Sequence, residues 1–142
     1  NFLRDKRTEF DWQEQPSDRN ILFPGLVNSI LCICHRVHFE LGPGFLHQVY
    51  RRATMIELMR NGISYEYVKQ LPIEYEGQLL GYQDVRLILV EGKVLLAVFA
   101  LRETANAMSE QLKAHLRRLD LKLGLLVNFY GTKLEIVPVR TK

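Results

Sequence analysis

The sequence predicts an α/β or α+β domain in which a central mixed sheet is flanked by helices. Two segments with helical spacing of apolar residues come first, at 21–39 and 45–61. Strand-like runs follow, and VLLAVFAL at 94–101 has eight consecutive apolar residues, as expected of a strand buried on both faces. A third helical segment at 106–119 then precedes two more strands. Helices that interrupt a series of strands in this way indicate a layered sheet with helices on its faces.

The three helices are predicted from apolar periodicity and from the residues that end them. The first is expected at Ile21–Phe39, because Pro24 is tolerated in a first turn and LGPG at 41–44 cannot continue a helix. The second, Phe45–Asn61, ends before Gly62 at the C′ position. Its expected buried side chains are Leu46, Val49, Tyr50, Ala53 and Ile56. The third helix is expected at Asn106–Leu119, with one apolar face formed by Met108, Leu112, His115, Leu116 and Leu119.

Six strands are predicted from alternation and from turn residues. Two short strands, Ile63–Tyr67 and Ile73–Tyr75, precede a long one at Leu79–Val90. The run at 94–101 follows the turn Glu91-Gly92-Lys93, and the last two strands are expected at Lys122–Phe129 and Leu134–Val139. The predicted order is therefore two helices, four strands, a helix and two strands.

The domain organisation is one core with a polar extension before it. The 142 residues are 47% hydrophobic, which is enough for one substantial core at residues 21–140. Residues 1–20 are polar and show no period, so they form an extension or a docking arm. Phe2, Phe10 and Trp12 would be the side chains that contact a protein partner.

Charge and cysteine content bear on the class of partner and on the cellular compartment. The net charge of +3 permits nucleic acid as a partner without requiring it. Cys32 and Cys34 are only two residues apart, which favours a reducing compartment over a disulfide framework. No apolar run reaches the roughly 20 residues of a membrane span. We expect a soluble intracellular protein, and the start at Asn1 leaves an organellar location open.

Several phrases of the sequence match one family as a set. They are LGPGFLHQVYRRATMIELMRNGI from 41 and LPIEYEGQLLG from 71, then VEGKV from 90 and LKLGLLVNFYGTKLEIVPV from 121. In this order and spacing the chain resembles the GxxExxxR protein family of the PD-(D/E)XK nuclease-like superfamily. The resemblance covers residues 21–140, and it implies a PD-(D/E)XK nuclease-like fold.

The resemblance also implies a metal site that this sequence has lost. The family would place an acid after the Gly-Pro-Gly turn, an Asp on one strand and a Glu-x-Lys on the next. Carboxylates of this kind bind Mg²⁺, and the Lys would stabilise phosphate charge. At those positions the chain has His47, Leu87, Ala97 and Phe99, although Arg51 of the motif remains.

We therefore expect a pocket filled by apolar side chains, with no metal, no cofactor and no catalytic residue. Asp84, Glu91, Glu103 and Glu40 are the acids that relocation of the site would use, but no replacement for the Lys accompanies them. Gln111 matches a polar position that the family retains, and a structural role is favoured for it.

Two other clusters suggest ligands and have simpler explanations. One cluster could include zinc ligands, although a role in the core is favoured for it: Cys32, Cys34, His35, His38 and His47. Arg51, Lys113, Arg117 and Arg118 could contact nucleic acid, but for so modest a net charge a solvated helix face is favoured.

Three functions remain open at this point. The favoured one is a non-catalytic nuclease-like domain, a pseudo-enzyme that serves as a structural or interaction subunit of a larger protein assembly. The alternatives are a domain that binds nucleic acid without cleaving it, and a metal-dependent nuclease with relocated carboxylates.

Overall fold

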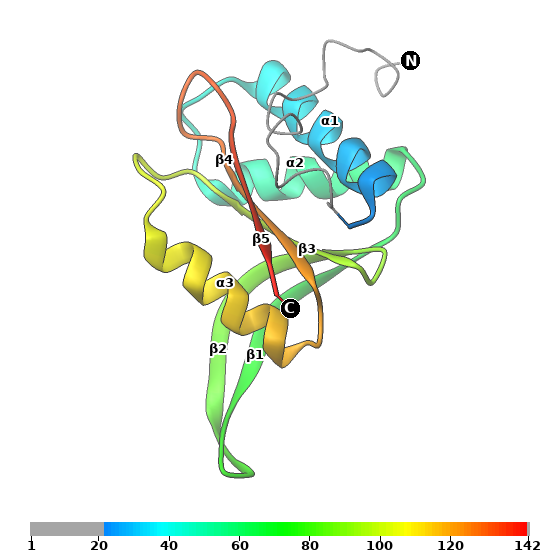
Figure 1. The fold of residues 1–142 in the computed structure, drawn as a ribbon. Coiled ribbons are helices and arrows are strands. Elements are labelled where there is room, and N and C mark those ends of the chain that lie inside the picture. Colours follow the sequence, from blue (N-terminus) through cyan, green and yellow to red (C-terminus); the bar gives the residue numbers. More distant parts are fainter. Residues whose placement is uncertain (1–21, 142) are drawn as a thin grey trace.

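The computed structural model describes residues 22–141 and consists of a five-stranded sheet between helices (Figure 1). Along the chain the elements are α1 (Pro24–Leu41), α2 (His47–Arg60), β1 (Tyr65–Tyr75), β2 (Gln78–Val90), β3 (Val94–Phe99), α3 (Asn106–Arg118), β4 (Leu123–Asn128) and β5 (Glu135–Arg140). The strands are arranged in the order β1-β2-β3-β4-β5. Only β3 and β4 are parallel, because α3 connects them across the sheet. The predicted mixed sheet flanked by helices is confirmed.

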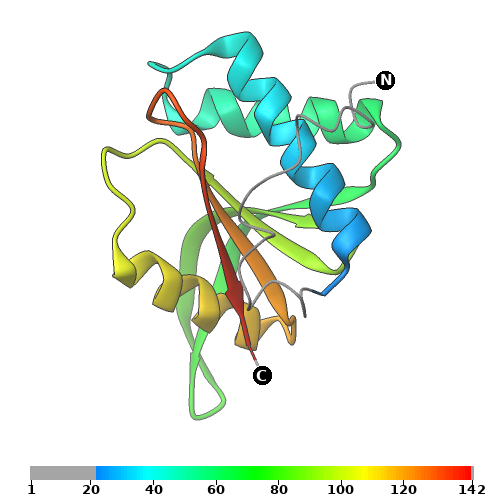
Figure 2. The ribbon, with the colours of Figure 1, turned by 45° about the horizontal axis from the view of Figure 1, so that its top comes forward.

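The sheet separates two hydrophobic cores (Figures 1 and 2). Helices α1 and α2 cover one face, where their buried side chains meet Ile88, Leu96 and Leu125. Helix α3 covers the other face through Leu112 and Leu116, which pack near Leu95 and Leu126. Successive residues of a strand point to opposite faces, so β3 and β4 contribute to both cores.

The helix boundaries follow from the residues predicted to set them. Pro24 is the first residue of α1, where its missing N–H costs no intrahelical bond. Gly42 follows α1 with φ of 71°, and its N–H bonds to the His38 carbonyl. Gly62 follows α2 with φ of 72° and donates to the Met59 carbonyl. These left-handed glycines end the two helices as expected.

Two predictions about these elements are wrong. The strands expected at Ile63–Tyr67 and Ile73–Tyr75 are one continuous strand, because the long β2 pairs with both parts and a bulge absorbs the irregular spacing between them. The buried face of α2 is also different: Leu46 and Ile56 are exposed, whereas Arg51 and Thr54 are buried. Tyr50, Thr54 and Leu58 form the stripe that meets the sheet.

The run at 94–101 is the central strand only as far as Phe99. Residues of β3 pair with β2 on one side and β4 on the other, which explains six apolar residues in succession. Ala100 and Leu101 lie beyond the strand, and Leu101 is 49% exposed. The chain therefore leaves the sheet at Phe99.

Candidate functional site

A cavity of about 300 Å³ lies where β3 ends, and residues of five elements border it, among them Leu126 of β4. Helix α2 contributes His47 and Arg51 from its first turns, and β2 contributes residues 84–87. The end of β3 contributes residues 97–101, and α3 closes the far side with Met108, Gln111, Leu112 and His115. A cavity of this size with mainly apolar walls and a few polar groups is typical of a small-ligand site.

The structure brings together all four positions at which the sequence departs from the family pattern. His47, Leu87, Ala97 and Phe99 all line this cavity. Leu87, Ala97 and Phe99 also belong to the same apolar cluster, since Ala97 and Phe99 are alternate residues of one strand. They come from three elements, α2, β2 and β3.

The apolar side chains expected at these positions are part of the core next to the cavity. Leu87 and Phe99 are buried, with 4% and 9% of their surfaces exposed, yet the cavity remains open above them. Ala97 is small and half-buried, so it leaves room where a longer side chain would stand. Leu87, Ala97 and Phe99 are therefore apolar walls of the cavity.

Arg51 is the polar residue that stands out in this cavity. It is only 5% exposed, and its guanidinium donates to Nδ1 of His47. The buried Nε has no hydrogen-bond partner, and Arg51 makes no ion pair among residues 22–141. Burial lowers the pKa of this guanidinium and Tyr67, beside it, partly offsets the effect.

His47 is held in its neutral form by the same surroundings. Burial lowers the pKa of His47, and the positive charges of Arg51 and Arg86 lower it further. Because a guanidinium can only donate hydrogen bonds, Nδ1 of the ring must accept from Arg51. The neutral ring then carries its proton on Nε2. His47 thus presents one N–H group and no charge.

Arg86 lies on a bulge in β2. Val68 pairs with Leu87 and Gln70 with Asp84, so two residues of β2 stand opposite Lys69 alone. Arg86 has φ of 51°, a left-handed conformation that is unfavourable for a side chain of this kind. Bulges near functional sites change the direction of a side chain, and here Arg86 borders the cavity.

Comparison with known families gives one match. The family model described as "PD-(D/E)XK nuclease superfamily" matches residues 25–139, most of the chain. The chain belongs to the PD-(D/E)XK nuclease superfamily. No curated protein and no solved structure matches it. In the part of the chain that the structure describes, no helix is long and apolar enough to cross a membrane.

The cavity does not have the donors that a PD-(D/E)XK nuclease uses to bind Mg²⁺. Asp84 contributes the only carboxylate among the described residues that line it. Its Oδ2 lies 3.7 Å from Nη2 of Arg86, and its Oδ1 accepts a 2.8 Å hydrogen bond from the side-chain amide of Gln70. No group of three His, Cys, Asp or Glu side chains within residues 22–141 is placed to hold a metal. Imidazole and hydrocarbon are poor substitutes for the oxygen ligands of a hard cation.

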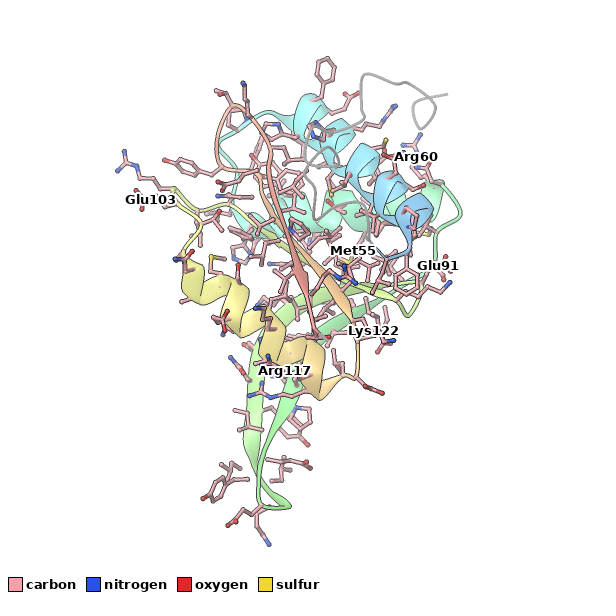
Figure 3. All side chains as sticks on the ribbon, in the orientation of Figure 1. Met55, Arg60, Glu91, Glu103, Arg117 and Lys122 are labelled. Atoms are coloured by element: carbon pink, nitrogen blue, oxygen red, sulfur yellow. The ribbon has the colours of Figure 1, made fainter. Side chains whose placement is uncertain are left out.

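The other candidate acids lie apart from this cavity. Glu91 is in the turn before β3, at the opposite end of that strand, and its carboxylate accepts from the Ser64 N–H. Glu103 is in the loop after β3, and Figure 3 shows Glu91 and Glu103 on opposite sides of the molecule. Glu40 is exposed near the end of α1. Of the four acids considered for relocation, only Asp84 borders the cavity.

The predicted basic contacts do not form one surface. Arg51 is buried in the cavity, whereas Lys113, Arg117 and Arg118 are on α3. Lys113 lies 3.6 Å from Glu110, while Arg117 and Arg118 are exposed. Figure 3 shows Arg117 and Lys122 near the C-terminal end of α3, apart from Arg60. The docking residues Phe2, Phe10 and Trp12 lie outside the described residues.

The cysteines and nearby histidines of α1 belong to the core. Cys32 and Cys34 are fully buried, and burial, together with the neighbouring Cys32, raises the pKa of Cys34 to about 12. A thiol with so high a pKa is a poor metal ligand, because the thiolate is the binding form. The ring Nε2 of His38 lies 2.8 Å from the Gly131 carbonyl, which ties α1 to the β4–β5 turn.

Asn128 positions the loop that borders the cavity, and the sequence analysis missed it. Its side-chain oxygen accepts from the N–H groups of Leu101 and Tyr130, and its amide donates to the Leu101 carbonyl at 2.7 Å. The side chain is 4% exposed. The signal in the sequence is that Asn128 is a single amide at the end of the apolar run LGLLVN. A buried polar side chain needs hydrogen-bond partners, so such an amide is expected to bind nearby groups.

Proposed function

We propose that this chain is a degenerate member of the GxxExxxR family, a nuclease-like domain that does not cleave and serves as an interaction subunit of a larger protein assembly. The observation that carries the proposal is the lining of the superfamily site. Histidine and hydrocarbon occupy the positions of the acids and the lysine, and the one carboxylate is already paired with Arg86. Mg²⁺ would lack the carboxylate ligands through which this chemistry holds the metal.

The β1–β2 hairpin supports a role in protein interaction. Its distal half extends beyond the rest of the sheet, because β3 pairs only with residues 88–90 of β2 (Figure 1). Four large side chains near its tip are more than half exposed: Tyr75, Leu79, Leu80 and Tyr82. An isolated two-stranded ribbon gains little from its own packing, so exposed apolar side chains on it favour a protein partner.

The first test asks whether the domain cleaves nucleic acid. With Mg²⁺ or Mn²⁺ we expect no cleavage of single- or double-stranded DNA or RNA. The double variant Ala97→Glu/Phe99→Lys should also remain inactive and should lose about 1.5–3 kcal/mol of stability, because Phe99 leaves the core. Metal-dependent cleavage that disappears in Asp84→Asn, with Glu103→Gln as a comparison, would instead establish the relocated site.

The second test asks what the hairpin binds. A tagged chain purified from its native cells, before and after exhaustive nuclease treatment, should retain stoichiometric protein partners. The variant Leu80→Glu/Tyr82→Glu should release them without loss of thermal stability. Phe39→Glu/Met59→Glu is the matched control, because those side chains are also more than half exposed but lie on the helices. Partners that persist in the hairpin variant would place the interface elsewhere.

Binding of nucleic acid without cleavage is the second candidate. It is favoured by Arg117 and Arg118, which are adjacent, exposed and unpaired with any acid among the described residues. Phosphate contacts would make the affinity fall steeply with salt and leave it insensitive to Mg²⁺. Partners that vanish after nuclease treatment, and binding that weakens in Arg117→Ala/Arg118→Ala, would favour this function over the first.

A further inference from the structure

We propose that the cavity at the end of β3 is a metal-independent binding site for a small amphipathic acid, with its phosphate or carboxylate group between Arg51 and Arg86 and its apolar part against α3. The inference deepens the proposed function and rests on its premise that no catalytic metal occupies the cavity. The ligand proposed here is a small molecule, whereas the partners proposed for the β1–β2 hairpin and for α3 are macromolecules.

The first argument is the uncompensated charge of Arg51. Buried cations are normally paired with an acid, because removing a charge from water is unfavourable. Arg51 is 5% exposed, has no acidic partner within residues 22–141, and donates a hydrogen bond to Nδ1 of His47. Its planar set of N–H donors suits a carboxylate or a phosphate. An anion in the cavity would provide the missing counter-charge.

The second argument is the placement of Arg86. A residue other than glycine with φ of 51° is retained here at the cavity edge, where the bulge of β2 presents it. Its partner Asp84 is 3.7 Å away and both side chains are about half exposed, so this ion pair is weak and can yield to a ligand. Two arginines and one aspartate leave the cavity with a net positive charge.

The third argument is that the cavity also has uncharged hydrogen-bonding groups and hydrocarbon walls. His47 accepts from Arg51 through Nδ1, which leaves its Nε2–H as a further donor on a cavity-lining ring. The amide of Gln111 lines the same space. The remaining walls are hydrocarbon, chiefly Leu87, Ala97, Phe99, Met108 and Leu112. Donors at one side and hydrocarbon at the other fit an acid that carries an apolar body.

The test measures binding in the full chain with EDTA present. The probes are phenyl phosphate, benzoate, inorganic phosphate and phenol, titrated by calorimetry and by NMR of the histidine rings. We expect phenyl phosphate or benzoate to bind more tightly than either phosphate or phenol alone, and their order tells phosphate from carboxylate. Bound anion should also raise the pKa of His47, since it offsets the positive charges beside the ring.

Three variants test the assigned residues. Arg51→Met should weaken binding by about tenfold or more, as expected for a lost charged hydrogen bond. Arg52→Met is the matched control, because the neighbouring Arg52 is exposed on the same helix and should bind as the parent does. Arg86→Asn tests the second arginine in a fold-neutral way, since asparagine tolerates the left-handed conformation.

The possible results separate this inference from the proposed function. The inference is overturned if no probe binds at millimolar concentration, if phenol binds as well as phenyl phosphate, or if Arg86→Asn and a folded Arg51→Met both bind normally. The absence of cleavage would stand in each of those cases. Binding that appears only after Mg²⁺ is added would overturn both, because it would require a metal in the cavity.

Discussion

The two faces of the sheet are built from alternate residues of the same strands, yet they have different properties. The face covered by α1 and α2 is closed, and its core side chains from β3 and β4 are almost completely buried. The face covered by α3 has a smaller core that ends in the open cavity. Leu96 belongs to the first face and its neighbour Ala97 to the second. One face therefore supplies most of the stability, and the other can leave space for a ligand.

The largest expected effect compares equal truncations on the two faces. Leu96→Ala should lower the free energy of unfolding by about 4 kcal/mol, because Leu96 is fully buried in the closed core. Leu126→Ala should cost nearer to about 2 kcal/mol, since Leu126 already lines the cavity and loses fewer contacts. Urea unfolding of both variants measures the difference. Equal losses would mean that the α3 face is packed as tightly as the other.

A smaller effect is expected where α3 approaches the sheet. A Cβ at Gly124 would lie 2.9 Å from Cδ2 of Leu112 and 3.1 Å from the Leu95 carbonyl oxygen. Gly124→Val should therefore push α3 outward and cost about 1–3 kcal/mol, measured by thermal or urea unfolding.

The control for this variant is Gly25→Ala on the other face. Nothing lies within 4 Å of a Cβ at Gly25, which is the second residue of α1. We expect a change of no more than about 0.5–1 kcal/mol, in the stabilising direction. If Gly124→Val is also neutral, then α3 is held loosely and the cavity can change its shape.

The smallest effect is a pH dependence on the closed face. Burial, followed by the charge of His38, lowers the pKa of His35 on α1 to about 4. The unfolded chain takes up this proton near pH 6.5, before the folded protein does. Stability should therefore fall as the pH drops from about 6.5 to about 4, and it should be fully present above that window.

His35→Gln should reduce that loss. Urea unfolding at pH 7 and pH 5 measures it, with His115→Gln as the comparison from the α3 face, where burial and then Arg118 lower the pKa of His115. An unchanged pH slope in His35→Gln would assign the acid sensitivity to other groups. If His115→Gln changes the pH dependence of stability more than His35→Gln does, the acid sensitivity lies mainly on the α3 face.

The sequence predicted the positions of the helices and strands far better than it predicted which of their side chains are buried. Apolar runs on β3 and β4, and the glycines after α1 and α2, indicate local structure directly because period and backbone freedom are local properties. The buried face of α2 was missed because Leu46 and Ile56 look like core residues, whereas Thr54 and Arg51 do not. Burial depends on which neighbouring element covers a side chain, and that is a tertiary property.

The same division applies to the site. The sequence alone predicted that His47, Leu87, Ala97 and Phe99 stand where the resembled family has its acids and lysine, and periodicity placed Ala97 and Phe99 on one side of β3. Only the tertiary structure decided that the cavity stays open, because volume depends on how α2, β2 and α3 are spaced around these side chains. It likewise decided that Arg51 is buried against His47 without an acid, and that a bulge turns Arg86 to the same edge. Those relations join residues far apart in the chain, and no local pattern encodes them.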